Sequence, residues 1–308
     1  MAILAVGSIA LDTIKSPYGK RERALGGSAT FFSLSASYFA EVRMIGVVGE
    51  DFTAADEEVL KRRGVDTRGI ERSEGKTFHW SGEYGANPND CKMHDLQLNV
   101  FERFQPKIPR EYQDSEYLFL GNINPSLQVE VHAKMKKTAR LVGLDSHPFW
   151  IDTVPEQLTA AIKEVDVMII NDGEARQFAG EHNLLRAAKR ILDKGPRALV
   201  IKHGEYGATI FFRDNSFGLG AHPFRSPAVP LEEVQDPTGA GDAFAGGFMG
   251  YIASQGILTA EVLKRAMFYG GVMGGFAVER FGTERLLELT RKEIDARFHL
   301  FRQMTHLD

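Results

Sequence analysis

Cysteine is almost absent from this chain of 308 residues, in which Cys91 stands alone. No disulfide can form within the chain, which is typical of proteins that work in a reducing compartment. No apolar run reaches the ~18 residues that a membrane-spanning helix requires. The apolar residues 1–10 follow no basic segment, so they predict a buried strand and not a signal peptide. We therefore expect a cytoplasmic protein that does not bind a membrane.

An excess of basic residues is also missing. Lysine and arginine together number 37 and aspartate and glutamate 41, which gives a net charge of −4. This balance argues against a nucleic-acid-binding protein, which usually carries a basic domain or stripe. The motifs of zinc proteases, cysteine metal clusters and serine hydrolases are absent as well. Residues 69–77 are similar to a phosphate-binding loop, but five residues separate Gly69 from Gly75 where the motif needs four.

Short apolar runs alternate with segments of helical period along most of the chain. The strand-like runs are residues 3–6, 42–48, 117–120, 141–144, 165–170 and 198–201. The helical segments are residues 29–39, 54–63, 126–138, 155–162, 184–194, 243–253 and 262–278. Strands that alternate with helices predict βαβ units. The fold class is therefore α/β, with a mostly parallel sheet between layers of helices and ligands beyond the carboxyl ends of its strands.

Two stretches break this rhythm. Residues 14–26 are short and basic, and residues 75–102 read as irregular or alternating strand. We predict that they form a small β lid over one edge of the sheet, although two surface hairpins would give the same pattern. The α/β domain then comprises residues 1–12, 27–74 and 104–308, and the lid comprises 13–26 and 75–103. Residues 211–220 predict a further hairpin.

The strongest chemical signal is the segment Asp236-Pro237-Thr238-Gly239-Ala240-Gly241-Asp242. Val234 is predicted to end a strand before it, and an apolar helix rich in small residues follows. Gly239 and Gly241 let backbone N–H groups turn toward a ligand, and the helix adds the positive end of its dipole. Asp242 would accept the proton of an attacking hydroxyl. The arrangement suits phosphoryl transfer, although a glycine-rich turn with an aspartate near a helix start is also a common structural device.

This segment resembles the carboxy-terminal signature of the ribokinase-like, or PfkB, carbohydrate kinases, Asp-Thr-x-Gly-Ala-Gly-Asp, with Pro237 in place of the usual threonine. The resemblance extends over nearly the whole chain. Residues 7–12 are similar to the family's first strand, which ends in an aspartate, and residues 26–27 to its di-glycine. Residues 171–174 are similar to its Asn-x-x-Glu motif, and residues 202–207 to its nucleotide-side strand and turn. The implied fold is a three-layer ribokinase-like sandwich with a small β lid.

The resemblance also implies the roles of individual residues. Asp242 is the catalytic base, and Gly239, Ala240 and Gly241 form the anion hole. The acceptor side comprises Asp12, Gly26, Gly27 and Phe31. The nucleotide side comprises Asn171, Glu174, Lys202, Gly204, Gly207, Thr238, Gly271 and Gly275. ATP is the implied donor, Glu174 would reach Mg²⁺ through water, and many members also bind a monovalent cation such as K⁺.

Several of these positions have a simpler structural explanation. Asn171 and Glu174 have the spacing of a helix capping box. The glycines at 204 and 207 suit a turn, and those at 271 and 275 suit close helix packing. A lone histidine at position 147, beside Asp145, could line the cleft but is more typical of a loop residue.

Position 31 departs from the family's pattern. Phe31 stands where many members carry an asparagine that contacts sugar hydroxyls. An aromatic side chain loses hydrogen-bonding capacity and gains stacking surface. This favours a nucleoside acceptor, as do Phe78, Trp80 and Tyr84 in the lid. The lid aromatics could equally pack against a second copy of the chain, so a homodimer through the lid is an open alternative.

We therefore predict an ATP-dependent carbohydrate kinase that phosphorylates a hydroxyl of a sugar or sugar-like small molecule, with Asp242 as general base. A nucleoside kinase of the same fold is the first alternative. A ligand-binding or regulatory protein without catalysis is the second, although the intact Gly-Ala-Gly-Asp sequence argues against it.

Overall fold

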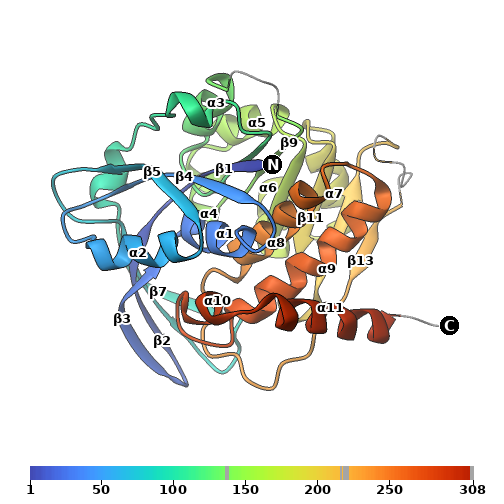
Figure 1. The fold of residues 1–308 in the computed structure, drawn as a ribbon. Coiled ribbons are helices and arrows are strands. Elements are labelled where there is room, and N and C mark those ends of the chain that lie inside the picture. Colours follow the sequence, from blue (N-terminus) through green and yellow to red (C-terminus); the bar gives the residue numbers. More distant parts are fainter. Residues whose placement is uncertain (136–138, 216, 218–221, 306–308) are drawn as a thin grey trace.

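The computed structural model describes residues 1–135, 139–215, 217 and 222–305 and contains two sheets (Figure 1). The strands of the large sheet are β1 (Ala2–Val6), β4 (Glu41–Val48), β5 (Val65–Arg72), β8 (Tyr117–Leu120), β9 (Leu141–Leu144), β10 (Val167–Asn171), β11 (Ala198–Lys202), β12 (Ala208–Phe212) and β13 (Phe224–Ser226). Their order across the sheet is β13-β12-β11-β10-β9-β8-β1-β4-β5. The pairs from β5 to β11 are parallel, and β12 and β13 add antiparallel strands at one edge. The predicted mostly parallel sheet is confirmed.

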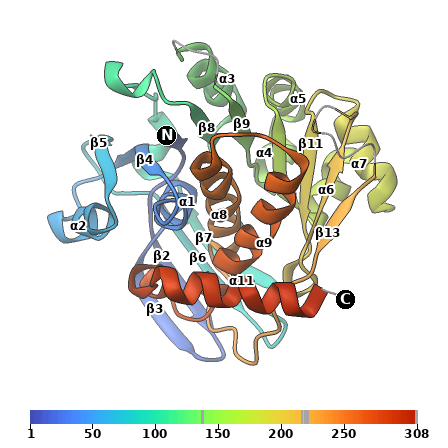
Figure 2. The same cartoon turned by 45° about the vertical axis from the view of Figure 1, so that its right-hand side comes forward.

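Helices cover both faces of the large sheet (Figure 2). One face packs against α1 (Ser28–Ala36), α8 (Ala240–Gln255) and α9 (Ala260–Ala277). The other packs against α3 (Pro125–Ala133), α4 (Pro148–Thr153), α5 (Pro155–Lys163), α6 (Asp172–Ala179) and α7 (Leu184–Leu192). Alternate residues of β1 divide between the two cores, with Ile3 and Ala5 in the first and Leu4 and Val6 in the second. This alternation is why its sequence is apolar throughout.

The remaining helices lie at the periphery. α2 (Ala54–Arg62) packs on β5, and α10 (Glu284–Glu288) and α11 (Arg291–Thr305) pack on α9. Short 3₁₀ turns are η1 (Asn99–Arg103), η2 (Arg110–Tyr112) and η3 (Gly204–Tyr206). Among the described residues, no helix combines the length and the apolar character needed to cross a bilayer.

The second sheet is small and has the order β3-β2-β6-β7. Its strands are β2 (Ala10–Ser16), β3 (Gly19–Gly26), β6 (His79–Tyr84) and β7 (Cys91–Gln97). They come from the two stretches that break the helical rhythm of the sequence, except that β2 begins slightly earlier. The small sheet therefore contains Asp12, which the sequence analysis assigned to the larger domain.

Several predicted boundaries change. The strand expected to end at Val234 is wrong, because residues 227–237 form no strand. Instead, the amides of Gln235 and Asp236 both donate to the carbonyl of Val278, which draws this segment to the end of α9. The helix predicted over 29–39 ends at Ala36, and the one over 126–138 ends at Ala133, with 136–138 outside the described residues. β12 and β13 form an antiparallel pair, but the hairpin predicted over 211–220 covers only the last two residues of β12 and none of β13. Residues 216 and 218–220 of that prediction lie outside the described residues.

Candidate active site

The loop before α8 has the shape that its glycines predict. Gly239 occupies the N-cap position with φ +74°, a conformation that side chains other than glycine rarely adopt. The ring of Phe31 also covers it, since a Cβ built on Gly239 would lie 2.2 Å from a ring carbon. α8 begins at Ala240 and places Asp242 in its first turn. The first N–H groups of a helix have no partner within the helix and can bind an anion, but that of Ala240 donates to the carbonyl of Pro237 at 3.3 Å in this structure.

Gly241 lies beside the end of a lysine side chain. Its φ is not in the left-handed region, so the backbone alone does not require glycine. A Cβ at this position would lie 2.7 Å from Nζ of Lys202. The lysine ammonium therefore lies directly over Gly241, at the predicted anion hole.

Asp236 holds the loop before α8 in place through two hydrogen bonds. Its side chain is fully buried and accepts hydrogen bonds from the amides of Thr238, at 2.9 Å, and Gly282, at 2.7 Å. The loop before α8 is thereby tied to the turn after α9. Asp236, the first residue of the signature, therefore organises the loop.

Three charged side chains meet beside Asp242. Asp145 follows β9, Glu174 lies in α6, and Lys202 ends β11. Nζ of Lys202 lies 3.4 Å from Oδ2 of Asp145. Because three carboxylates share one ammonium group, the site carries an excess of negative charge.

Burial and this excess charge change the protonation of the site. Burial, followed by the charge of Asp145, raises the pKa of both Asp242 and Glu174 to about 7. Burial also raises the pKa of Asp145, against the opposing charge of Lys202. For Lys202, burial lowers the pKa, but the neighbouring carboxylates outweigh it and hold the pKa above its ordinary value. Groups tuned toward neutral pH in one cluster are typical of a catalytic centre.

Asn171 and Glu174 form the capping box that their spacing allows. The amide of Glu174 donates to Oδ1 of Asn171, and the amide of Asn171 donates to Oε2 of Glu174, both at 2.8 Å. The two side chains thus start α6 just after β10, at the edge of the sheet where Lys202 also lies. Their predicted contact with magnesium and phosphate stays a prediction.

The predicted acceptor residues come together between the two sheets. The carboxylate of Asp12 is buried and accepts a hydrogen bond from the amide of Trp80 at 3.2 Å. A Cβ on Gly26 would lie 2.2 Å from Oδ2 of Asp12, and one on Gly27 would lie 2.4 Å from the carbonyl of Ser8. Both glycines are therefore required by close approach, and Gly27 also by its φ of +94°.

Phe31 lies closer to the anion hole than its position in the sequence suggests. Its side chain is only 1% exposed, and its ring lies near Gly26 as well as against Gly239. The ring therefore lies between the predicted acceptor side, at Gly26, and the predicted phosphate side, at Gly239. Direct stacking of Phe31 on a ligand stays a prediction, because in this structure its partners are within the protein.

The small sheet reaches the signature loop. The hydroxyl of Thr238 donates to the hydroxyl of Tyr84, at the end of β6, over 3.2 Å. Trp80 and Tyr84 belong to one face of β6, with ring centroids 6.4 Å apart. At the tip of the same hairpin, Asn89 lies so close to Gly204 that a Cβ there would meet its Oδ1 at 2.3 Å.

The remaining glycines of the nucleotide side have structural causes. Gly204 and Gly207 have φ of +56° and +90° in the turn between β11 and β12. A Cβ on Gly271 would lie 3.3 Å from Phe301, and one on Gly275 would lie 3.7 Å from Arg297. Both neighbours belong to α11, so tight helix packing favours glycine at 271, whereas the contact at 275 is an ordinary van der Waals distance that leaves room for a Cβ. A role for them in binding the nucleotide stays a prediction.

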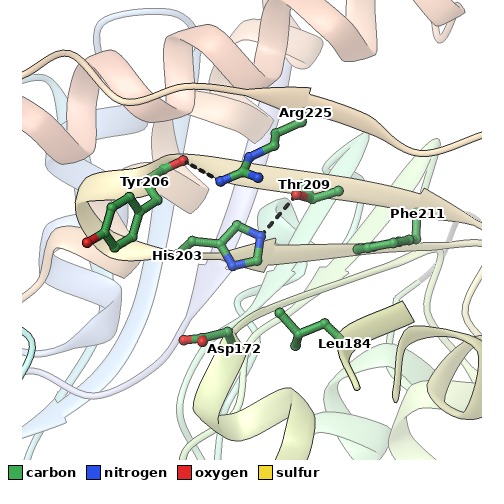
Figure 3. A pocket seen from close by; sticks show the side chains of 7 residues that line it. All are labelled: Asp172, Leu184, His203, Tyr206, Thr209, Phe211 and Arg225. Atoms are coloured by element: carbon green, nitrogen blue, oxygen red, sulfur yellow. Dashed lines mark hydrogen bonds between the residues drawn. The ribbon is translucent and has the colours of Figure 1, made fainter. Parts of the chain in front are cut away.

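A separate surface pocket lies on the other side of the β11–β12 hairpin. It measures about 330 Å³ and is lined by Asp172, Leu184, His203, Tyr206, Thr209, Phe211 and Arg225 (Figure 3). His203 lies within 3.0 Å of the Thr209 hydroxyl, and Arg225 donates to the carbonyl of Tyr206. Phe211 packs with the core under α3 to α7, whereas α8 lies on the opposite face. This pocket is therefore not the site around Asp242.

Asp145 is the main residue that sequence reasoning missed as part of the site. The available signal was a carboxylate directly after a buried parallel strand, at the sheet edge where ligands bind. His147, considered for the cleft, accepts a hydrogen bond from the amide of Phe149 at 3.2 Å and caps α4. It is a loop histidine with a structural partner, as expected.

Comparison with solved structures identifies the fold. A nucleoside kinase from Burkholderia thailandensis in complex with inosine superposes with a TM-score of 0.79 at 23% identity, over 97% of this chain and 98% of that one. A fructokinase from Vibrio cholerae, solved with fructose, ADP and calcium, has a TM-score of 0.77 at 18% identity, over 96% and 98% of the two chains. Both likenesses show that the architecture is that of ribokinase-fold kinases.

Sequence comparison identifies the family. A cytidine kinase from Thermococcus kodakarensis is 28% identical over 254 residues, which cover 80% of this chain and 87% of the relative. A nucleoside kinase from Methanothermobacter thermautotrophicus is 24% identical over 92% of this chain and 91% of the relative. The model of the pfkB family carbohydrate kinases matches residues 4–289. The chain therefore belongs to the pfkB family of carbohydrate kinases, enzymes that transfer a phosphoryl group to a hydroxyl.

Proposed function

We propose that this kinase phosphorylates a hydroxyl on the sugar of a nucleoside, with ATP as donor. The observation that carries the choice of acceptor is the aromatic face of β6 above the signature loop. Tyr84 bonds to Thr238 in that loop, and Trp80 lies on the same face of the strand. A flat apolar base has stacking partners there that a free sugar does not need.

The comparisons support this choice without deciding it. The relatives named above include a cytidine kinase and a nucleoside kinase, and the structure bound to inosine is also a nucleoside kinase. A fructokinase has almost the same TM-score. Phe31 favours the nucleoside, because it cannot make the hydrogen bonds that an asparagine makes to sugar hydroxyls. A sugar kinase is the second candidate.

The geometry supports transfer in a single displacement. Asp12 would orient the acceptor from the small sheet, and Asp242 would take the proton of its hydroxyl. The N–H groups of Gly239, Ala240 and Gly241, with the ammonium of Lys202 above them, would stabilise the charge on the phosphoryl group. The amide of Ala240 would exchange its 3.3 Å hydrogen bond to Pro237 for one to the phosphoryl group. The small sheet would act as a lid that excludes water during transfer.

The charge of the cluster fits an ATP-bound cation better than a site built by the protein. Among the described residues, no group of three or more His, Cys, Asp or Glu side chains is arranged to hold a metal ion. Magnesium would therefore be carried by the ATP phosphates and neutralise their charge, with Glu174 holding a water molecule toward it. Asn171 and the turn at Gly204 and Gly207 would border the phosphates. A monovalent cation such as K⁺ near the anion hole is part of the same proposal.

The remaining expectations concern the setting of the enzyme. We propose that it works in the cytoplasm, where ATP is available. A homodimer through the small sheet is proposed as well, because β7 is an edge strand whose residues are mostly exposed. Light scattering at several concentrations would show whether the chain is a monomer or a dimer.

The experiment that tests the proposed function measures ADP release from Mg-ATP with a panel of nucleosides, free sugars and sugar acids. We expect one or more nucleosides to give the highest kcat/KM, and Asp242→Asn to lower that turnover by ~10²-fold or more. Preference for a free sugar would replace the nucleoside proposal by the second candidate. Binding of nucleosides without ADP release from any acceptor would favour a protein that binds without catalysis.

A further inference from the structure

Asp145 and Lys202 form a buried ion pair at the centre of the large sheet. They stand at the carboxyl ends of β9 and β11, on either side of β10. The distance from Nζ of Lys202 to Oδ2 of Asp145 is 3.4 Å, and their side chains are only 15% and 8% exposed. No motif assigned a role to Asp145.

The carboxylate of Asp145 is itself held in place. Its Oδ1 accepts a hydrogen bond from the amide of Ser146 at 2.8 Å. Its backbone amide donates to the carbonyl of Leu120 at 3.0 Å, and its carbonyl accepts from Nε2 of Gln128 at 3.1 Å. Because β8 and α3 both fix it, Asp145 is a rigid anchor for a flexible partner.

Lys202 needs such an anchor, because a lysine ammonium is a mobile point charge on four methylene groups. Two other carboxylates, on Glu174 and Asp242, attract it as well. An ammonium paired with Asp242 would weaken that carboxylate as a base and would leave the loop. In the structure it lies over Gly241 instead, where a Cβ would come within 2.7 Å of Nζ.

We propose that Asp145 is a positioning residue that holds the ammonium of Lys202 over Gly241, so that its charge faces the transferring phosphoryl group and stays away from Asp242. Asp145 touches neither the acceptor nor ATP in this proposal and acts through Lys202. The proposal rests on the proposed role of the loop at 239–241. It does not depend on which acceptor the enzyme uses.

A double-mutant cycle tests whether Asp145 acts through Lys202. We would measure kcat, and KM for Mg-ATP and acceptor, in the wild type, Asp145→Asn, Lys202→Met and the double variant, at a pH well above the pKa of Asp242, where the direct effect of the Asp145 charge on that pKa no longer matters. Each single variant is expected to lower kcat by ~10-fold or more, with KM for the acceptor unchanged. The double variant should be no slower than Lys202→Met alone, within about twofold, because the two residues act as a unit.

Two outcomes would overturn the proposal. In one, the losses multiply in the double variant, so that Asp145 acts independently of Lys202. In the other, Asp145→Asn keeps kcat within about twofold of the wild type. If circular dichroism shows that Asp145→Asn does not fold, Asp145→Glu takes its place, since it keeps the charge but displaces the carboxylate. Its loss should likewise vanish in the Lys202→Met background, and persistence of the loss there would contradict the proposal.

Asp166→Asn is the matched control. Asp166 also forms an ion pair, with Arg197 at 3.0 Å, and accepts a hydrogen bond from the amide of Val142 at 2.9 Å. It precedes β10, at the opposite edge of the sheet from Asp145. We expect Asp166→Asn to lower the melting temperature but not kcat. If Asp166→Asn lowered kcat as much as Asp145→Asn does, the loss in Asp145→Asn would be explained by general destabilisation.

The cycle can be separated from the proposed function. If no nucleoside is phosphorylated by the wild type, the choice of acceptor has failed, and the same four proteins are compared in the slow hydrolysis of Mg-ATP. That reaction uses the phosphoryl side of the site without an acceptor. The same non-additivity is expected there, and its absence would count against the positioning role alone.

Discussion

The ring of Phe31, in the first turn of α1, lies directly against Gly239 at the N-cap of α8. A Cβ on that glycine would come within 2.2 Å of the ring. Phe31, which replaces the asparagine of the family's acceptor motif, thus also contacts the predicted anion hole. This contact links the acceptor side of the site to the phosphoryl side.

Gly239→Ala should test that contact. Alanine at φ +74° costs about 1–2 kcal/mol in backbone strain, and its methyl group must also displace the Phe31 ring. We expect a lower melting temperature and a loss of kcat of ~10²-fold, since the amides of the loop would move. Steady-state kinetics and thermal unfolding measure both effects.

Gly180→Ala is the control for the backbone strain that alanine causes at a positive φ. Gly180 also has a positive φ, +57°, but nothing lies within 4 Å of a Cβ there. It should destabilise the protein through strain alone and leave kcat unchanged. Equal kcat for Gly239→Ala and Gly180→Ala would show that the ring contact does not matter to catalysis.

The activity should fall below neutral pH. Burial and the charge of Asp145 raise the pKa of Asp242 to about 7, and only the ionised carboxylate can accept a proton. kcat/KM should therefore lose about tenfold for each unit of pH below this value and level off above it. A profile that stays flat down to about pH 5.5 would remove Asp242 from the role of general base.

Asp12 should destabilise the protein as the pH rises. Burial, which outweighs the hydrogen bond from Trp80, raises its pKa to about 8 from an ordinary value of 3.8. The folded state therefore binds the proton more tightly than the unfolded state. The protonated Asp12 therefore contributes its full stabilisation of the folded state below about pH 4, and this contribution is lost as the pH rises toward 8.

Asp12→Asn removes this ionisation and keeps the shape of the side chain. We expect its melting temperature to exceed that of the wild type at pH 8 and to match it near pH 4, with weaker binding of the acceptor. Differential scanning calorimetry at both pH values measures the difference. A variant less stable than the wild type at pH 8 would show that the Asp12 carboxylate is stabilised when charged.

Tyr84→Phe should loosen the small sheet from the signature loop. The change removes one hydroxyl, and with it the 3.2 Å bond to Thr238, but keeps the ring. If this bond helps to keep the site closed, ATP hydrolysis without acceptor should rise several-fold relative to phosphoryl transfer. ADP release measured with and without acceptor gives the ratio.

Tyr18→Phe is the control on the same sheet. Tyr18 lies between β2 and β3 and is 48% exposed, away from the loop. Its ratio of hydrolysis to transfer should equal that of the wild type. An unchanged ratio in Tyr84→Phe would mean that the hydroxyl contact does not control closure.

Local patterns of the sequence predicted most of the fold. All six strand-like runs became strands of the large sheet, because residues buried on both faces must be apolar throughout. β5 was missed, since it lies at the edge of the sheet and is mostly polar, with Val65 and Ile70 as its large apolar residues. The prediction of a strand before Asp236 was wrong. The amides of Gln235 and Asp236 donate to the carbonyl of Val278 at the end of α9, a partner that no local pattern reveals.

The sequence by itself determined the family and predicted the anion-binding loop and the catalytic aspartate, because these depend on glycines and a carboxylate at fixed short spacing. The tertiary structure decided which charges surround that aspartate. Lys202 meets Asp145 and Gly241, and Phe31 meets Gly239, only because parallel strands end at one edge of the sheet and α1 and α8 pack on the same face. Such contacts join distant segments, and their partners are selected by packing in three dimensions, which local spacing does not encode.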